Sequence, residues 1–145
     1  MNLTVYRRAR RALATLCVVW LATNAALAQD PRATAAQAAA RDWLELTDRG
    51  NAQASWATAG KKFQAALPAS GWADSLKKAR APFGAITSRA IFKTVFQTTF
   101  PGAPEGDYAL IDYTTNFAGR PAAHETVTLE RETDGAWRVV GYYIR

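Results

Sequence analysis

AHETVTLERETDGAWRVVGYYIR, residues Ala123–Arg145, carries the clearest structural signal in the chain. Polar and apolar residues alternate over Ala123–Glu132, which is the two-residue period of a strand with one buried face. Asp134 and Gly135 follow, and an Asp-Gly pair suits the tight turn of a β-hairpin because both residues tolerate the left-handed conformation. A second run rich in Val and Tyr, Ala136–Arg145, completes the pattern. The sequence therefore ends in a predicted antiparallel hairpin.

Two further strands are predicted upstream of this hairpin. The segments Ile86–Phe100 and Asp107–Phe117 are rich in Thr, Ile, Val, Phe and Tyr, the residue types that favour strands. Pro101–Gly106 separates them, and Gly119–Pro121 leads from the second into Ala123–Glu132. Four strands joined by short turns predict an antiparallel meander.

Three helices are predicted before the sheet. Small and apolar residues recur at three- and four-residue steps over Thr34–Gly50, as on one face of an amphipathic helix. A second helix is predicted over Asn51–Leu67, with a bend or break at Gly60, and a third over Ser70–Gly84, with Asn and Ser as their N-caps. The predicted fold class is α+β: N-terminal helices packed on a curved four-stranded antiparallel meander sheet, cone-like in shape.

The N-terminus has the order of segments that marks a cleavable signal peptide. Met1–Arg11 carries four arginines and no acid, an apolar run follows over Ala12–Ala22, and small residues precede a predicted cut after Ala28. The apolar run is shorter than the roughly 20 residues of a membrane-spanning helix, so we expect no stable membrane anchor; an uncleaved N-terminal anchor is the alternative. Residues 1–28 are thus predicted to be a signal peptide and residues 29–145 a single periplasmic or secreted domain.

Cleavage would change the composition of the working protein. The whole chain of 145 residues has a net charge of +6 and one cysteine, Cys17. Removing residues 1–28 takes away four arginines and Cys17, so that 117 residues with 14 basic and 12 acidic side chains remain. The resulting charge of +2 gives no electrostatic basis for binding nucleic acid. Without a cysteine, the domain has no disulfide and no thiolate chemistry.

A resemblance to a known family is carried by residues spread over the domain. They are Trp56, the run Arg80–Gly84 with Arg89, the turn Pro101–Tyr108, Glu125, and the ending Trp137–Arg145. On these residues the sequence resembles the bacterial family known as domain of unknown function 4019. Helices followed by a curved meander are also similar to the nuclear transport factor 2-like and cystatin-like cones. The resemblance implies an exported single-domain bacterial protein with no established activity, and it gives no catalytic residues to carry over.

Asp112 and His124 are the candidate catalytic residues. Asp112 lies in the middle of a predicted strand, where a carboxylate needs a partner or a pocket. If its face lined a pocket, its pKa would be raised and it could act as a base; the interpretation we favour is a salt bridge to Arg89 or Arg138 on the sheet surface. His124, the only histidine, could pair with Asp112 or Glu125, but a surface position at the end of a strand is favoured.

The sequence offers no recognisable cofactor or metal motif. A single histidine without a cysteine cluster cannot complete an ordinary zinc site. The glycine patterns of serine hydrolases, P-loop proteins and dinucleotide-binding folds are missing as well. We therefore expect no metal and no cofactor.

Aromatic and arginine side chains are the candidates for ligand binding. An apolar cavity fringed by a few polar groups is the usual composition of a small-ligand pocket. Arg80 and Arg89 flank a predicted turn and could bind a carboxylate or phosphate bidentately; we favour the structural alternative, in which they tie the turn to acids on neighbouring strands. The predicted ligand-binding residues are Trp56, Arg80, Arg89, Tyr113, Tyr142 and Tyr143.

Together these features favour a non-catalytic exported domain that binds a small apolar ligand or a protein partner. The alternative is an acid-base enzyme, an isomerase, dehydratase or lyase, that uses Asp112 with a tyrosine or with His124. A third interpretation is an assembly module that forms a homodimer through the open face of its sheet. No nucleic-acid partner is expected.

Overall fold

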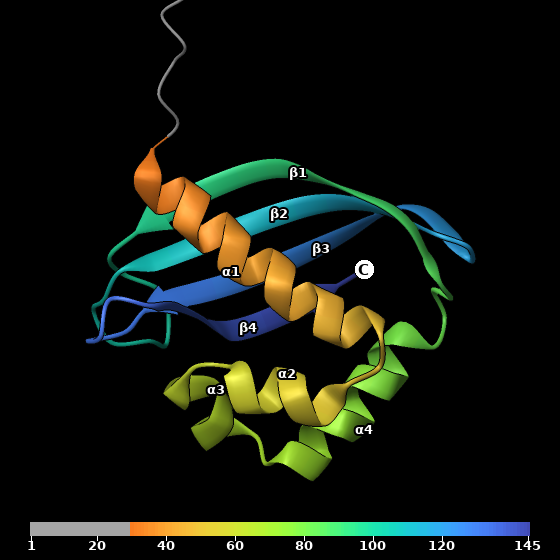
Figure 1. Cartoon of the computed structure of the whole chain (residues 1–145), viewed down its shortest axis with the longest axis horizontal. Helices are drawn as coiled ribbons and strands as arrows, with labels where there is room; N and C mark the ends of the chain where they lie inside the picture. Colours follow the sequence, from red (N-terminus) through yellow and green to blue (C-terminus); the bar gives the residue numbers. More distant parts are fainter. Residues whose placement is uncertain (1–29) are drawn as a thin grey trace, which may run out of the picture.

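The helices come first and the sheet follows in the structure (Figure 1), a computed structural model that describes residues 30–145. The predicted signal peptide, residues 1–28, with Cys17, lies outside the described residues. Figure 1 shows the longest helix, α1 (Pro31–Asp48), running diagonally across one face of the sheet, with three shorter helices gathered beside the last strand. Within residues 30–145 no helix is long and apolar enough to cross a membrane.

The second predicted helix is broken, as its glycine indicated. α2 (Ala52–Thr58) and α3 (Lys61–Ala66) are separated at Gly60, whose backbone N–H donates to the carbonyl of Val139 at 2.8 Å. A Cβ atom at Gly60 would lie 3.0 Å from a methyl group of Val140, so the close approach to the sheet favours glycine. Residues 30–145 therefore contain four helices where the sequence predicted three, with Gly60 bonded to the sheet at the break.

α4 (Ala69–Arg80) begins two positions earlier than its predicted cap implies. Its N-cap is Pro68, and Ser70 lies inside the first turn, so the predicted Ser70 cap was wrong. Proline suits the start of a helix because its φ is already near the helical value and it has no N–H to leave unpaired. The basic residues of the last turn lie at the negative end of the helix dipole, which stabilises them there.

Four antiparallel strands follow one another in the sheet, which confirms the predicted meander and the α+β fold class. They are β1 (Ile86–Gln97), β2 (Tyr108–Phe117), β3 (Arg120–Arg131) and β4 (Trp137–Ile144). The first strand ends before Phe100, where the prediction had placed its end, and Phe100 instead forms an isolated bridge to Ala103 inside the turn.

The two faces of the sheet differ in burial. In β2 and β3 the residues that face the helices are buried, and most of those between them are half-buried. The buried row of β3 contains Ala123, Glu125, Val127 and Leu129, so a carboxylate stands among apolar residues. This buried carboxylate, Glu125, is the first residue of the candidate functional site.

Aromatic rings fill the space between the helices and the sheet. Trp43 of α1 and Trp72 of α4 lie 5.6 Å apart between ring centroids, and Phe63 meets Trp72 edge to face at 5.0 Å. Ser55 satisfies both indole N–H groups: its carbonyl accepts from Trp43 at 2.8 Å and its hydroxyl from Trp72 at 2.9 Å. Because Ser55 is fully buried, these bonds join α1, α2 and α4 without help from water.

Replacing Ser55 by alanine tests this arrangement. In Ser55→Ala the indole N–H of Trp72 loses its buried acceptor, while the bond from Trp43 to the backbone carbonyl is kept. We expect the free energy of unfolding to fall by about 1–3 kcal/mol, the cost of an unpaired buried donor. Urea unfolding followed by tryptophan fluorescence measures the change. The control Thr58→Ala, at an exposed position of the same helix, should stay within about 0.5 kcal/mol of the wild type; equal losses in the two variants would refute the role of the Ser55 hydroxyl.

Candidate functional site

A buried carboxylate stands between the sheet and the helices. Glu125 of β3 is fully buried on the face that the helices cover. Nη1 of Arg80, the last residue of α4, donates to its Oε1 at 2.9 Å, and Nε of Arg89 on β1 donates to its Oε2 at 2.6 Å. A buried carboxylate without such partners would cost several kcal/mol, so the two arginines offset the cost of burying Glu125.

A second acid completes the arrangement. Asp48, the last residue of α1, accepts from Nη1 and Nη2 of Arg89 at 2.8 and 3.0 Å, the paired geometry that suits a guanidinium and a carboxylate. Nη2 of Arg80 also donates to Asp48. We call Asp48, Arg80, Arg89 and Glu125 the four-charge cluster, whose formal charges cancel. Both arginines therefore bind acids of the chain itself: Glu125 lies on a strand, as the structural interpretation predicted, whereas Asp48 lies at the end of a helix.

Two neutral side chains complete the hydrogen bonding of Glu125. The hydroxyl of Tyr142 on β4 donates to Oε1 and that of Thr115 on β2 donates to Oε2, both at 2.6 Å. With the two arginines, the carboxylate accepts four hydrogen bonds. The four-charge cluster and these hydroxyls thus join the ends of α1 and α4 to all four strands.

The charges of the cluster stabilise one another. Burial alone would raise the pKa of Asp48, but the hydrogen bonds and positive charges of Arg89 and Arg80 outweigh it and hold that pKa below its usual value. Burial alone would lower the pKa of Arg89, and its hydrogen bonds to Asp48 and Glu125 raise it instead. Burial and the charge of Glu125 raise the pKa of Tyr142. None of these three groups is poised to exchange a proton near neutral pH.

A hollow of about 410 Å³ opens beside the cluster, between α1 and the sheet. We call it the α1 hollow. Its lining residues are Gln37, Arg41, Leu44 and Glu45 of α1, Arg89 and Ile91 of β1, and Tyr113 of β2. Arg89 belongs both to the four-charge cluster and to the lining of the hollow, so the cluster forms part of the wall.

Tyr113 brings an unpaired polar group to the α1 hollow. Its side chain is buried, and its hydroxyl oxygen has no hydrogen-bond partner within residues 30–145. Burial raises the pKa of Tyr113 to about 12, against the opposing charge of Arg89. The hydroxyl therefore stays protonated and can donate a hydrogen bond. An unpaired buried hydroxyl costs about 1–3 kcal/mol, which a hydrogen-bonding group placed in the hollow would recover.

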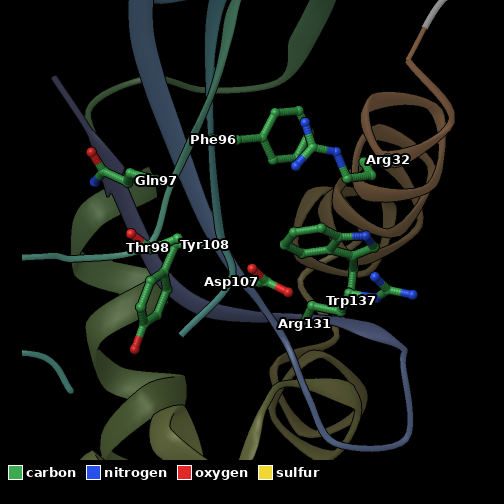
Figure 2. Close-up of a pocket in the computed structure, with 8 residues that line it drawn as sticks. All are labelled: Arg32, Phe96, Gln97, Thr98, Asp107, Tyr108, Arg131 and Trp137. Carbon is green, nitrogen blue, oxygen red and sulfur yellow. The ribbon is translucent and has the colours of Figure 1, made fainter. Parts of the chain in front are cut away.

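A smaller hollow of about 240 Å³ lies where the start of α1 meets the end of the sheet (Figure 2). Figure 2 shows the guanidinium of Arg32 against the ring of Phe96, with the indole of Trp137 beside them. The guanidinium carbon lies 4.6 Å from the centroid of Phe96, within the range of a cation–π contact. The aromatic face of this hollow is therefore already covered by a side chain of the protein.

A third hollow is an apolar groove of about 600 Å³ between α3 and the turn Phe100–Pro104. Its one basic residue, Lys62, donates to the hydroxyl of Tyr108 at 2.8 Å and to Glu130 at 2.6 Å. The amine of Lys62 and these two oxygens thus have hydrogen-bond partners, whereas the hydroxyl of Tyr113 has none within residues 30–145. Of these three hollows, the α1 hollow is the one that combines an unpaired polar group, charged side chains and apolar walls.

Four of the six predicted ligand-binding residues come together at or beside the four-charge cluster: Arg80, Arg89, Tyr113 and Tyr142. The other two lie apart. Trp56 donates its indole N–H to the carbonyl of Leu67 at 2.7 Å, within the helical layer. Tyr143 is 59% exposed and points to the side of β4 opposite to Tyr142.

The two candidate catalytic residues lie on the face of the sheet that the helices leave open. Asp112 is half-buried and accepts from Oγ1 of Thr126 at 2.7 Å. The predicted salt bridge of Asp112 to Arg89 or Arg138 was wrong, because Arg89 lies on the helix side and Arg138 pairs with two acids of its own hairpin. His124 is exposed on β3, and neither residue lines the α1 hollow.

The sequence analysis did not predict the acids that the arginines bind. Glu125 carried a signal, because it alternates with Val127 and Leu129 and so belongs to a buried row. Asp48 carried none, since a carboxylate in an amphipathic helix most often faces water. Arg41 and Glu45 are exposed residues of α1 that the sequence analysis did not single out, and the structure places both at the rim of the α1 hollow.

The comparison with protein families gives one match. The family model described as "Protein of unknown function (DUF4019)" matches residues 39–142. The chain belongs to the DUF4019 family. Searches of curated proteins and of solved structures find no match. The DUF4019 segment includes the whole four-charge cluster and Tyr113, so the candidate site belongs to the family domain, and the family description assigns no function to it.

Two tyrosine variants separate a paired hydroxyl from an unpaired one. Tyr142→Phe leaves Glu125 with one hydrogen bond fewer, so we expect the free energy of unfolding to fall by about 1–3 kcal/mol. Tyr113→Phe removes a buried hydroxyl without a partner, so we expect no loss, or a gain of up to about 1 kcal/mol. Chemical denaturation of both proteins at pH 7 measures the difference, and a matching loss in Tyr113→Phe would mean that its hydroxyl is paired after all.

The low pKa of Asp48 predicts a loss of stability in acid. The unfolded chain binds a proton at Asp48 near pH 3.9, where the folded chain does not, so stability rises with pH in this range. The contribution is fully present above about pH 5 and is lost as the pH falls through the folded pKa. Asp48→Asn should therefore be less stable at pH 7 and show a shallower decline between about pH 5 and 2.

Unfolding free energies measured against pH test this expectation. The control Asp42→Asn removes an exposed carboxylate from the same helix and should keep the wild-type profile. If Asp48→Asn declined as steeply as the wild type, the acid dependence would have to come from other groups.

Proposed function

We propose that the protein is a non-catalytic binding module that holds a small ligand in the α1 hollow. The observation that carries the proposal is the hydroxyl of Tyr113, buried beside this hollow without a partner. Native proteins pair nearly all buried polar groups, so an exception at a concave site needs an explanation. A ligand that supplies the missing hydrogen bond is the explanation we favour.

The composition of the α1 hollow suits a small molecule. Its volume of about 410 Å³ lies toward the low end of the range for ligand pockets. Leu44 and Ile91 offer apolar surface to the body of a ligand, while Arg89 and Tyr113 offer hydrogen bonds to a polar head. Ligand pockets usually combine apolar walls with a few polar groups, and the polar groups orient the ligand.

The titration behaviour of the site favours binding over acid-base catalysis. A general acid or base works best with a pKa near the working pH. The pKa of Tyr113 is raised to about 12, and that of Asp48 is held below its usual value, so both are far from neutral pH. The enzyme interpretation relied on Asp112, which stands on the opposite face of the sheet.

Blocking the α1 hollow tests this function. Ile91 is 44% exposed, so Ile91→Trp should fill the hollow without disturbing the core, and the neighbouring Phe92→Trp, where the wild-type side chain is 71% exposed, is its matched control. Phenyl and hexyl compounds with carboxylate, amide, amine or hydroxyl heads serve as probes in NMR titrations. We expect at least one to bind the wild type with a Kd in the millimolar range, typical of such small compounds.

Ile91→Trp should abolish this binding and Phe92→Trp should preserve it. Thermal unfolding of the three proteins shows whether the variants remain folded. Probe binding that survives in Ile91→Trp, or no binding of any probe to the wild type, would defeat the proposal.

The N-terminal pattern supports the further proposal that this module works outside the cytoplasm. A basic segment, an apolar run and small residues before Ala28 are what a signal peptidase recognises. Intact-mass measurement of protein recovered from the periplasm or medium of a bacterial host should give a chain that begins at Gln29. A chain that retains Met1 in that fraction would show that the signal is not cleaved.

A further inference from the structure

We infer that the ligand of the α1 hollow is a small organic carboxylate, with its head group between Arg89 and Tyr113. This inference rests on the proposed function, because it concerns the same hollow. It adds the chemical class of the ligand, which follows from the hydrogen-bond donors and the charges of the wall.

Arg89 has hydrogen-bond donors that the described residues do not use. A guanidinium carries five N–H groups, and three of those of Arg89 are used, one for Glu125 and two for Asp48. The other two have no hydrogen-bond acceptor among the described residues. Arg89 lines the hollow, so a ligand at that wall would lie next to its side chain.

Tyr113 adds a further donor on the neighbouring strand. β1 and β2 are paired, with Ile91 opposite Tyr113 and Arg89 opposite Thr115. Arg89 and Tyr113 therefore lie on adjacent strands, displaced along them by one inward-facing position. The guanidinium carbon of Arg89 lies 6.0 Å from the ring centroid of Tyr113. Donors from two adjacent side chains match the two oxygens of a carboxylate.

The two buried acids near the hollow are already neutralised, because Asp48 and Glu125 are balanced by the arginines of the four-charge cluster. Two residues of opposite charge stand at the rim. Glu45 accepts from Arg49 at 3.2 Å, and Arg41, within residues 30–145, pairs with the adjacent Asp42 at 3.3 Å.

Both rim pairs are exposed and contribute little, so the charges of Arg41 and Glu45 are both open to a ligand. A head group that accepts hydrogen bonds can use the donors of Arg89 and Tyr113, whereas an ammonium group carries donors only. The donors therefore favour a carboxylate over an amine, and the greater strength of charge-assisted hydrogen bonds favours it over a neutral head.

The rest of the wall limits the tail of the ligand. Leu44 of α1 is buried, and Ile91 lies beside both donor residues with 44% of its surface exposed, so apolar side chains make up the wall around the donors. With about 410 Å³ available, a carboxylate with a short aliphatic or aromatic tail fits, and an extended lipid chain does not.

The test compares probes that differ only in the head group. The full chain is titrated with benzoate, benzamide and benzylamine, and with hexanoate and hexanamide, and the chemical shifts of residues around the hollow are followed by NMR. We expect each carboxylate to bind at least about tenfold more tightly than its amide, the effect of one charge-assisted contact, and benzylamine to bind most weakly.

Single substitutions at the hollow show which residues cause the preference for a carboxylate. Arg41→Gln and Tyr113→Phe should each weaken benzoate binding about three- to tenfold and change benzamide binding less, because they remove a charge and a donor. Lys78→Gln removes the same charge from an exposed position of α4 that does not line the hollow, and should leave both affinities unchanged.

The outcomes separate this inference from the function on which it rests. If benzamide or benzylamine binds as tightly as benzoate and Ile91→Trp blocks it, the hollow is a ligand site but the carboxylate class is wrong. If benzoate binds and Ile91→Trp does not affect it, the carboxylate site lies elsewhere and the inference fails. If no probe shifts the resonances of the hollow, both the inference and the proposed function are overturned.

Discussion

The carboxylate of Glu125 accepts four hydrogen bonds in a fully buried position, and each donor comes from a different element of the fold. Removing one partner of a buried ion pair leaves an uncompensated charge, at a cost of about 3–5 kcal/mol, which is a large part of the stability of a domain of this size. Because Arg80 is the last residue of α4 and Asp48 the last of α1, both helices must end where the cluster needs them. The position of the helices on the sheet therefore depends on this one buried acid.

The α1 hollow follows from the same constraint. Asp48 fixes one end of α1 against Arg89, and the helix then runs across the sheet (Figure 1). Leu44 of α1 lines the α1 hollow together with Tyr113 and Ile91 of the sheet. The hydroxyl of Tyr113 cannot join the hydrogen bonds of Glu125, since that carboxylate already accepts four. A fully satisfied cluster thus leaves its neighbour unpaired, at the edge of a space large enough for a small molecule. In this way the interaction that stabilises the fold also shapes the candidate site.

The local features of the fold were predictable from the sequence, and the long-range contacts were not. Alternation and the turn at Asp134 and Gly135 predicted the final hairpin, and Gly60 indicated the break between two helices. The cluster joins residues of α1, α4 and two strands, and no periodicity specifies which acid meets which arginine across such distances in the chain. The same limit explains the error at Asp112, which lies opposite Thr126 rather than an arginine. Alternation puts Asp112 and Tyr113 on opposite faces of the sheet, but it could not say which face the helices cover or which residue Asp112 meets.

A double-mutant cycle on the two acids tests most directly whether the four charges act as a unit. Asp48 and Glu125 share no hydrogen bond, and each binds both Arg80 and Arg89. Asp48→Asn and Glu125→Gln each leave one acid between the arginines, whereas the double variant leaves two buried guanidinium groups without a counter-charge. The account predicts that the loss of unfolding free energy in the double variant exceeds the sum of the single losses by at least about 1 kcal/mol. Losses that add within about 0.5 kcal/mol would contradict it, because independent pairs would then be sufficient to explain the fold.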